Sequence, residues 1–260
     1  MKCIQHQIKG TSAYLLPISD THIGDRNFDR KSLQGYLDWV DNEPNARIFL
    51  NGDIINVAGI TTASSVFDQE ADLNTQIEMA TNIFMPYKNK ILGAISGNHE
   101  QRLEKAFGYN PMIPICHNLG VKYLGYSAIV DIKLITGRFK RTHHEIGETI
   151  NYTFFCHHTT GGGGTVGGKM NRVDMLRKLV SNADAYIGSH NHQLGIIPVE
   201  SRHYSAAKKG IVVQRQILVD SGSFLKWNDS YAEKMQLVPS KIGAVRIRMD
   251  GLKKDLHCSL

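Results

Sequence analysis

Short apolar runs that end in polar or glycine-rich clusters recur along the chain. The runs cover residues 14–18, 47–50, 90–95, 152–156 and 185–187, and the clusters that follow are SDTHIG, NGD, SGNHE, HH and GSHNH. Short apolar runs bounded by turn-forming residues are typical of buried strands. We therefore predict five strands, each with a polar loop at its carboxyl end.

Segments with helical spacing separate several of these runs. The apolar positions recur at intervals of three or four in three sets, namely Leu33, Leu37 and Val40; Leu73, Ile77, Ala80 and Phe84; and Leu176, Val180 and Ala183. Strands that alternate with helices predict an α/β layered fold, in which ligands gather at the carboxyl ends of the strands. All five polar clusters fall there.

The middle and the C-terminal part of the chain have a strand-like alternation. Residues 128–135 and 148–155 flank a basic loop at 138–144, which predicts an antiparallel hairpin. Residues 210–219 and 243–249 predict a further strand pair, forming a second sheet packed on the first. Because the chain has no linker, repeat or low-complexity tract, residues 1–260 are expected to form a single domain.

Composition changes this picture only slightly. The 260 residues are 42% hydrophobic, which is enough for a full core, and 30 Lys and Arg against 24 Asp and Glu give a net charge of +6. That charge favours a polyanionic partner such as nucleic acid, although many soluble enzymes are equally basic. The four cysteines show no CxxC spacing and predict reduced thiols.

No segment of the sequence predicts a leader or a membrane anchor. The first residues include Gln, His and Lys where a signal peptide would be apolar, and no run approaches the roughly 18 apolar residues of a membrane span. We expect a soluble, cytoplasmic protein without a membrane partner. The oligomeric state cannot be read from the sequence.

Two acidic motifs follow the first two predicted strands. Asp20 and His22 form a D-x-H pair, and Asp53 ends the NGD motif after Gly52, which lets the backbone turn tightly. Each motif taken alone is an ordinary loop feature.

Histidine-rich motifs follow the other three strands. Asn98, His99 and Glu100 come in direct succession in GNHE, the pair at 157 and 158 ends the fourth strand, and His190 and His192 form an H-x-H. Carboxylate, amide and imidazole groups are common metal ligands. Their conjunction at five strand ends predicts a metal site.

These motifs, in this order, resemble the calcineurin-like metallophosphoesterase superfamily over residues 14 to 195. The resemblance implies two mixed β-sheets packed as a sandwich and flanked by helices, in a four-layer α/β/β/α arrangement. Two details depart from the family pattern. Ser189 precedes His190 where many members have Gly-His directly, and Asn56 stands where many have an Asp.

The resemblance also implies a set of ligands for two divalent metal ions. One ion would be held by Asp20, His22, Asp53 and His192, and the other by Asp53, Asn98, His190 and either His157 or His158. The strand-end position favours His157, while the spacing to the glycines that follow is also compatible with His158. Oxygen and imidazole ligands suit Mn²⁺, our first expectation, and also Fe, Zn²⁺ or Ni²⁺.

Such a site predicts an enzyme that hydrolyses a phosphomonoester or a phosphodiester. Two cations about 3.5 to 4 Å apart can bind a bridging hydroxide and clamp the phosphate oxygens. By resemblance, His99 would stabilise the transition state or protonate the leaving oxygen, and Glu100 could orient it. Arg102 would contact a substrate phosphate or pair with an acid.

A glycine-rich run, GGGGTVGGK, contains GxxxxGK after a strand, as in a nucleotide-binding loop. Met170 replaces the Ser or Thr that such a loop needs for Mg²⁺, which argues against that interpretation. The glycines would instead form a loop at the rim of the metal site. Lys169 would then bind substrate phosphate or merely belong to the helix that follows.

Alternative functions stay open within and outside the enzyme class. A DNA exonuclease or endonuclease of the repair type fits the net charge, and aromatic residues in GSFLKWNDSYAEKM could stack on bases. A non-catalytic metal-binding scaffold is the alternative from another class. The HTTGGGG and GSF segments look like an uncharacterised branch common among phage-encoded proteins, which implies a bacterial host cell.

Overall fold

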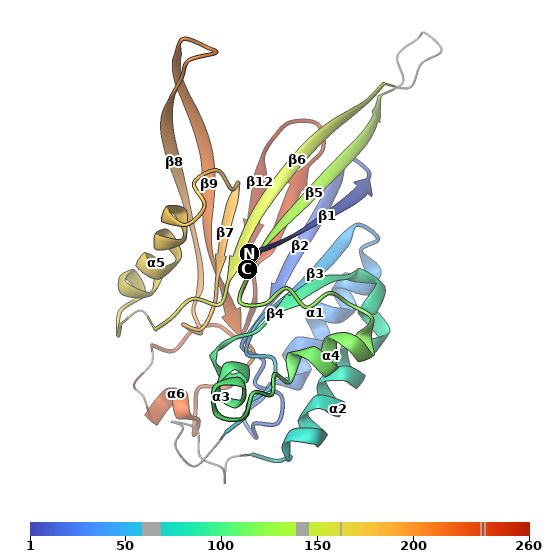
Figure 1. The fold of residues 1–260 in the computed structure, drawn as a ribbon, viewed down its shortest axis with the longest axis vertical. Helices are drawn as coiled ribbons and strands as arrows, with labels where there is room; N and C mark the ends of the chain where they lie inside the picture. Colours follow the sequence, from blue (N-terminus) through green and yellow to red (C-terminus); the bar gives the residue numbers. More distant parts are fainter. Residues whose placement is uncertain (59–68, 139–145, 162, 235, 237) are drawn as a thin grey trace.

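The computed structural model describes residues 1–58, 69–138, 146–161, 163–234, 236 and 238–260. Residues 139–144 of the basic loop lie outside this range. Figure 1 shows the described elements in sequence colours.

The strands form two mixed sheets. The five-stranded sheet has the order β12 (Leu256–Ser259), β11 (Arg246–Asp250), β2 (Ser12–Ile18), β3 (Ala46–Asn51) and β4 (Ile91–Ile95). The seven-stranded sheet has the order β1 (Lys2–Lys9), β5 (Ser127–Arg138), β6 (Ile146–His157), β7 (Ala185–Gly188), β9 (Gly210–Ser223) and β10 (Gly243–Ala244), and β8 (Leu194–Ser205) also pairs with β9. Hairpins β5–β6 and β8–β9 project from one end and diverge (Figure 1).

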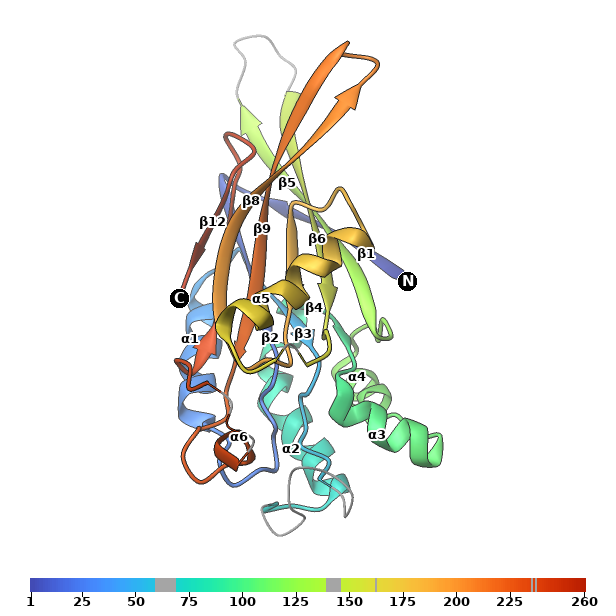
Figure 2. The same ribbon diagram turned by 90° about the vertical axis from the view of Figure 1, so that its left-hand side faces the viewer.

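Helices cover the outer face of each sheet. On the five-stranded sheet lie α1 (Arg30–Asn42), α2 (Leu73–Phe84), the 3-10 helix η2 (Met85–Lys90) and α4 (Met112–Leu119), with α3 (Asn98–Phe107) following β4. On the seven-stranded sheet lie α5 (Val166–Asp174) and the 3-10 helix η3 (Met175–Lys178). The short helix α6 (Tyr231–Lys234) lies near the C-terminal loops (Figure 2).

Three apolar clusters hold these layers together. One lies between α1, α2, α4 and the five-stranded sheet, a second between the two sheets, and a third between α5 and the seven-stranded sheet. The middle cluster includes Phe49, Tyr152 and Phe154, all fully buried. The layers therefore run helix, sheet, sheet, helix, which confirms the four-layer α/β/β/α fold class.

The predicted strands and two of the predicted helices are confirmed. Apolar runs at 14–18, 47–50, 90–95, 152–156 and 185–187 fall on β2, β3, β4, β6 and β7, and the predicted hairpin is the antiparallel pair β5–β6. Helix α1 buries Leu33, Leu37 and Val40, and it begins where the Asp29 side chain accepts a hydrogen bond from the Ser32 N–H.

Two expectations of secondary structure are wrong. The helix predicted through Val180 and Ala183 ends at residue 178, because the chain must turn at 181–184 to enter β7. Residues 210–219 and 243–249 do not form a separate sheet. Strand β9 joins the seven-stranded sheet, whereas β11 pairs with β2, with Ile247 opposite Leu15, in the other sheet.

The carboxyl ends of the central strands of both sheets meet at one place. Strands β2, β3 and β4 run parallel, as do β6, β7 and β9. A contact of 2.6 Å between the hydroxyls of Ser19 and Ser221 joins the end of β2 to the end of β9. The polar loops that follow these strands are thereby brought together from two sheets. Within the described part of the chain, no helix is both long and apolar enough to cross a membrane.

We expect Phe49→Ala to lower the free energy of unfolding by about 3–5 kcal/mol, because the ring fills the space between the sheets. Urea denaturation followed by circular dichroism measures this change. Phe107→Ala is the matched control, since that ring is 78% exposed, and it should change stability by less than about 0.5 kcal/mol. Equal losses for the two variants would contradict the assignment of the core.

Candidate metal centre

Backbone hydrogen bonds hold the loops after β2 and β3 side by side. The Asp20 N–H donates to Gly52 O at 3.1 Å, and the His22 N–H donates to Asp53 O at 3.2 Å. These bonds extend the pairing of the two parallel strands into the loops. They place both acidic motifs next to each other at the junction of the sheets.

Five of the predicted site residues have a left-handed backbone conformation. Their φ angles are 48° for Asp20, 47° for His22, 51° for Asp53, 76° for His190 and 52° for His192. Residues other than glycine rarely adopt this conformation, and it is concentrated at functional sites. The side chains of the D-x-H and H-x-H pairs therefore converge through tight turns of the backbone.

Glycine at two positions lets the backbone approach Asp53 closely. A Cβ atom on Gly97 would lie 2.2 Å from Asp53 Oδ1, and one on Gly52 would lie 2.5 Å from the Gly97 nitrogen. The His99 N–H, at the N-terminus of α3, donates to Asp53 Oδ1 at 2.8 Å. The partial positive charge of the helix end therefore stabilises this buried carboxylate.

Glu100 supports the backbone around Asp53. Its carboxylate accepts hydrogen bonds from four backbone N–H groups, those of Gly97, Asp53, Ile54 and Ile55, at 2.7–3.2 Å. Burial and the nearby Asp53 raise its pKa to about 7, and the bonds from the backbone oppose this shift. Glu100 thus holds the backbone that carries Asp53, whereas orientation of His99 was expected.

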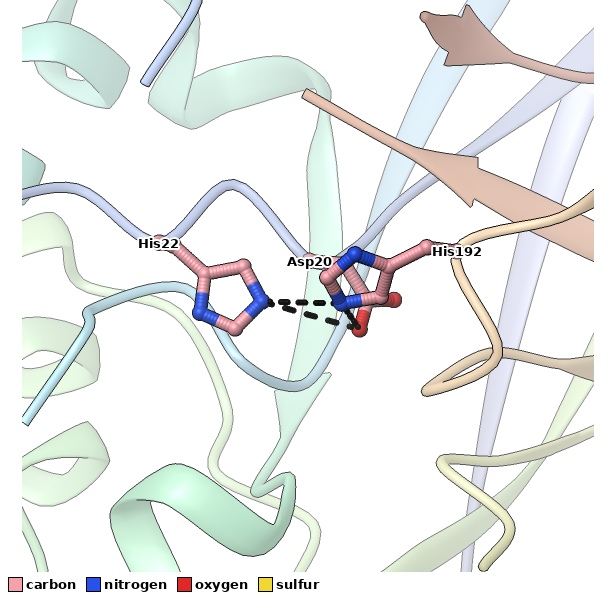
Figure 3. Close-up of side chains that lie close together, drawn as sticks. All are labelled: Asp20, His22 and His192. Carbon is pink, nitrogen blue, oxygen red and sulfur yellow. Dashed lines mark hydrogen bonds and ion pairs between the residues drawn. The ribbon is translucent and has the colours of Figure 1, made fainter. Parts of the chain in front are cut away.

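One group of ligand atoms consists of Asp20, His22 and His192 (Figure 3). Nε2 of His192 lies 3.3 Å from Asp20 Oδ1, and Nε2 of His22 lies 3.9 Å from the same oxygen. The two imidazole nitrogens are 3.1 Å apart. The three atoms therefore face one common point.

A second group consists of Asp53, His158 and His190. Nε2 of His158 lies 3.0 Å from Asp53 Oδ2 and 3.2 Å from Asn98 Oδ1. The same nitrogen is 4.0 Å from Asp20 Oδ1, so the two groups adjoin each other. A third group, which overlaps both, joins His22 and Asp53 to His99.

The structure places His158 in the cluster, and not His157. In β6, Tyr152, Phe154 and Cys156 face the other sheet, and two residues further on His158 continues the same face. Nδ1 of His157 instead accepts a hydrogen bond from the Thr159 N–H at 2.7 Å. The alternation of side chains along β6 is the sequence signal that distinguishes the two histidines.

Two further contacts fix the orientation of the His158 ring. Its Nδ1 lies 2.9 Å from the Asn51 carbonyl oxygen and 2.8 Å from the Ser189 hydroxyl, which leaves Nε2 directed at the cluster. Ser189, one of the two departures from the family pattern, therefore contacts a predicted ligand directly. At the other departure, the backbone oxygen of Asn56 accepts a hydrogen bond from His99 Nδ1.

The charges at the site stabilise one another. Burial alone would raise the pKa of Asp20, but His158 and His192 outweigh it and lower the pKa to about 2. Burial alone would lower the pKa of His158, but Asp53 and Asp20 outweigh it and raise the pKa to about 10. The carboxylates are thus ionised at neutral pH and attract positive charge.

The residues present fit divalent cations. Burial lowers the pKa of His22 and His190, so these rings are neutral, and Asp20 and Asp53 are anionic, which are the protonation states of metal ligands. Asp20 Oδ1 and Asp53 Oδ2 accept no hydrogen bond of good geometry from the described residues. Ligands at about 2.0–2.2 Å from a cation lie about 3–3.5 Å from each other, close to the shortest separations here.

His99 and Arg102 border this cluster. Nε2 of His99 lies 3.8 Å from Asp53 Oδ2, and an Arg102 nitrogen lies 3.3 Å from His99 Nδ1. Burial, reinforced by the Arg102 charge and opposed by Asp53, lowers the pKa of His99 to about 4. The ring is therefore neutral in this arrangement.

Lys169 does not lie on an exposed rim. It belongs to α5, is 1% exposed, and has a buried ammonium group. This burial speaks against the predicted contact with substrate phosphate. The sequence reasoning also missed Asp220, fully buried near the site, although Asp220 follows the apolar run 217–219 in the same way as the other site residues follow theirs.

The sequence matches no protein-family model and no curated protein. Among solved structures, the Haemophilus influenzae NAD nucleotidase (NadN) aligns with 96% of this chain at 9% identity and a TM-score of 0.45. The chain spans about half (49%) of that protein. Wild-type Vps29 complexed with Zn²⁺, from Entamoeba histolytica, aligns over 95% of this chain and 97% of its own, at 11% identity and a TM-score of 0.38. Because both TM-scores are below 0.5, the function is inferred from the residues of this chain.

We expect His158→Ala to lose one of two bound Mn²⁺ equivalents, because its Nε2 faces Asp53 and Asn98. His157→Ala, its neighbour with the ring turned away, should keep both. Isothermal titration calorimetry of the metal-free proteins measures the stoichiometry. Loss of an equivalent in His157→Ala alone would show that the wrong histidine has been assigned.

Proposed function

We propose that this chain is a phosphoesterase that uses two divalent metal ions. The observation that carries the proposal is the pair of adjoining ligand groups, Asp20 with His22 and His192, and Asp53 with His158 and His190. Buried carboxylates that attract positive charge, with imidazole nitrogens facing them, are suited to cations and not to a protein nucleophile.

The first group, with Asp53, would hold one ion, and the second group, with Asn98, would hold the other. Asp53 would contribute to both sites, because its carboxylate groups with His22 as well as with His158 and His190, and the His99 N–H fixes its Oδ1. Two such ions, when bound, neutralise the charge of a phosphate ester and activate water for in-line attack. Mn²⁺ is the first choice for reconstitution, with Zn²⁺, Fe and Ni²⁺ as alternatives.

His99 is proposed to donate a proton to the leaving oxygen. Its Nδ1–H donates to the Asn56 carbonyl oxygen, so Nε2 faces the site and is the atom that can carry a transferable proton. Burial keeps the ring neutral here, with a pKa of about 4. The negative charge of a bound phosphate ester would favour protonation of Nε2, and Arg102, beside the ring, is placed to contact a phosphate oxygen.

The proposed substrates are phosphate esters, with a small phosphomonoester or phosphodiester as the first class. Nucleic acid is the second candidate, favoured by the net charge of +6. A non-catalytic metal-binding scaffold would use the same ligands without His99. A substrate panel that contains all these chemistries separates the three.

We expect the Mn²⁺-loaded protein to hydrolyse a generic phosphodiester or phosphomonoester, or single- or double-stranded DNA. Chelation of the metal should abolish the activity, and Mn²⁺ should restore it. Asp53→Ala should be inactive, and His99→Ala should lower kcat by about 10²- to 10⁴-fold while both metals stay bound, as expected for loss of a proton donor.

His117→Ala is the matched control, because this histidine is exposed at the end of α4 and its variant should keep full activity. A wild-type protein that binds two metals but is as inert as Asp53→Ala on every substrate would contradict the proposed enzyme and favour the scaffold. Failure to bind any metal would contradict both.

A further inference from the structure

Asp220 is a buried carboxylate that the proposed mechanism does not use. It lies in β9, between β7 and β8, and is fully buried. Its Oδ2 accepts a hydrogen bond of 3.1 Å from the side-chain amide of Asn191, while Oδ1 has no hydrogen-bond partner among the described residues. Its one direct hydrogen bond therefore goes to the middle residue of the H-x-H motif.

Two glycines allow helix α5 to pack directly on the sheet beside Asp220. Gly188 and Gly195 are its cross-strand partners on β7 and β8. A Cβ on Gly188 would lie 2.7 Å from Val173, and one on Gly195 would lie 2.6 Å from the sulfur of Met170. Because Val173 and Met170 belong to α5, the Asp220 side chain also faces this helix.

Lys169 extends from the same helix into this buried region. Its amino group has no hydrogen-bond partner among the described residues, and it lies one helical turn before Val173 on the buried face of α5. Burial lowers the pKa of Lys169 and the Asp220 carboxylate opposes this shift. In turn, burial raises the pKa of Asp220 to about 8, and Asn191 and Lys169 oppose it.

The turn that Asn191 occupies needs to be held in place. His190 and His192 on either side have φ angles of 76° and 52°, which are unfavourable for residues other than glycine. The His190 N–H donates to Asp20 Oδ2 at 3.1 Å, which anchors one end of the turn. The Asn191 side chain, 3% exposed and bonded to Asp220, is a second anchor.

We propose that Asp220 positions His190 and His192 for metal binding through the hydrogen bond that it accepts from Asn191, and that Lys169, buried on the face of α5 that packs on the same part of the sheet, supports Asp220. Both are positioning residues and neither touches metal or substrate. The inference rests on the proposed function, because it concerns the affinity of the same metal centre. It also connects the glycine-rich segment before α5 to that centre, since Lys169 is carried by the helix that this segment precedes.

Asp220→Ala should weaken Mn²⁺ binding about 10- to 100-fold, the usual effect of removing a group that orients a ligand. Asp220→Asn should retain most of the affinity, because its amide oxygen can still accept the bond from Asn191. The affinities are measured by calorimetry on folded, metal-free protein, with circular dichroism to establish the fold. Asp184→Ala is the matched control, since Asp184 is a buried aspartate of the same sheet that bonds to the Thr153 N–H and Lys254.

A second measurement does not depend on metal. In metal-free protein labelled with ¹⁵N-asparagine, the Asn191 side-chain amide should exchange slowly with solvent in the wild type and rapidly in Asp220→Ala. Its signal is identified by its loss in Asn191→Ala. For the support that Lys169 gives Asp220, the stability losses of Lys169→Met and Asp220→Asn should exceed in sum the loss of the double variant.

Wild-type metal affinity in Asp220→Ala, an equal loss in Asp184→Ala, or an unchanged Asn191 signal would each overturn the inference, as would strictly additive losses for the Lys169 and Asp220 variants. A wild-type protein that takes up no metal would instead contradict the proposed function. The exchange of the Asn191 amide would still be measurable in that case, so the two failures are distinguishable.

Discussion

Two carboxylates, those of Asp20 and Asp53, are buried where the two sheets meet, and most of the local structure compensates their charge. Removing a carboxylate from water costs several kcal/mol even after the protein relaxes. Backbone N–H groups of His190 and His99 each donate to one of the two carboxylates, and imidazole rings face their remaining oxygens. Glycine at 52 and 97 makes these approaches sterically allowed. A pair of buried carboxylates with imidazole nitrogens around it is thus built where the two sheets of the sandwich meet.

The same arrangement stores strain in the backbone. Five site residues adopt a left-handed conformation that costs roughly 1–2 kcal/mol each. The strain is supported by hydrogen bonds that continue the β2–β3 ladder and by Glu100, which accepts four backbone N–H groups. Burial of the three apolar clusters offsets this cost in the free energy of folding. The strained backbone of the site therefore depends on the hydrogen bonds and the packed layers that surround it.

Much of the fold could be predicted from local patterns. The apolar runs of β2, β3, β4, β6 and β7 are short and bounded by turn residues, so hydrophobic period and turn chemistry agree for each of them. Strands β1 and β8 were missed because their inward positions are mixed with charged and polar residues. The end of the helix at residue 178 was missed because tertiary structure, the entry into β7, decides it.

The residues of the candidate site could be predicted from the motifs, but several of their contacts could not. The motifs identify the residues that meet, since the carboxyl ends of parallel strands lie at one edge. No local pattern shows which strand belongs to which sheet, so the burial of Lys169 and the contact of Ser189 with His158 could not be foreseen. The preference for His158 was available in principle, because it continues the inward face of Tyr152, Phe154 and Cys156.

The pairing of β11 with β2 has a consequence for the order of folding. Ile247 lies opposite Leu15, so a central strand from the beginning of the chain receives one of its neighbours only from the end. Contacts of such large sequence separation slow folding, and until they form an unpaired strand edge is exposed to other chains. During synthesis, β2 can pair with β11 only after nearly the whole polypeptide has been made. Aggregation of partly synthesised chains is therefore a hazard that comes with a sheet assembled from both ends of the sequence.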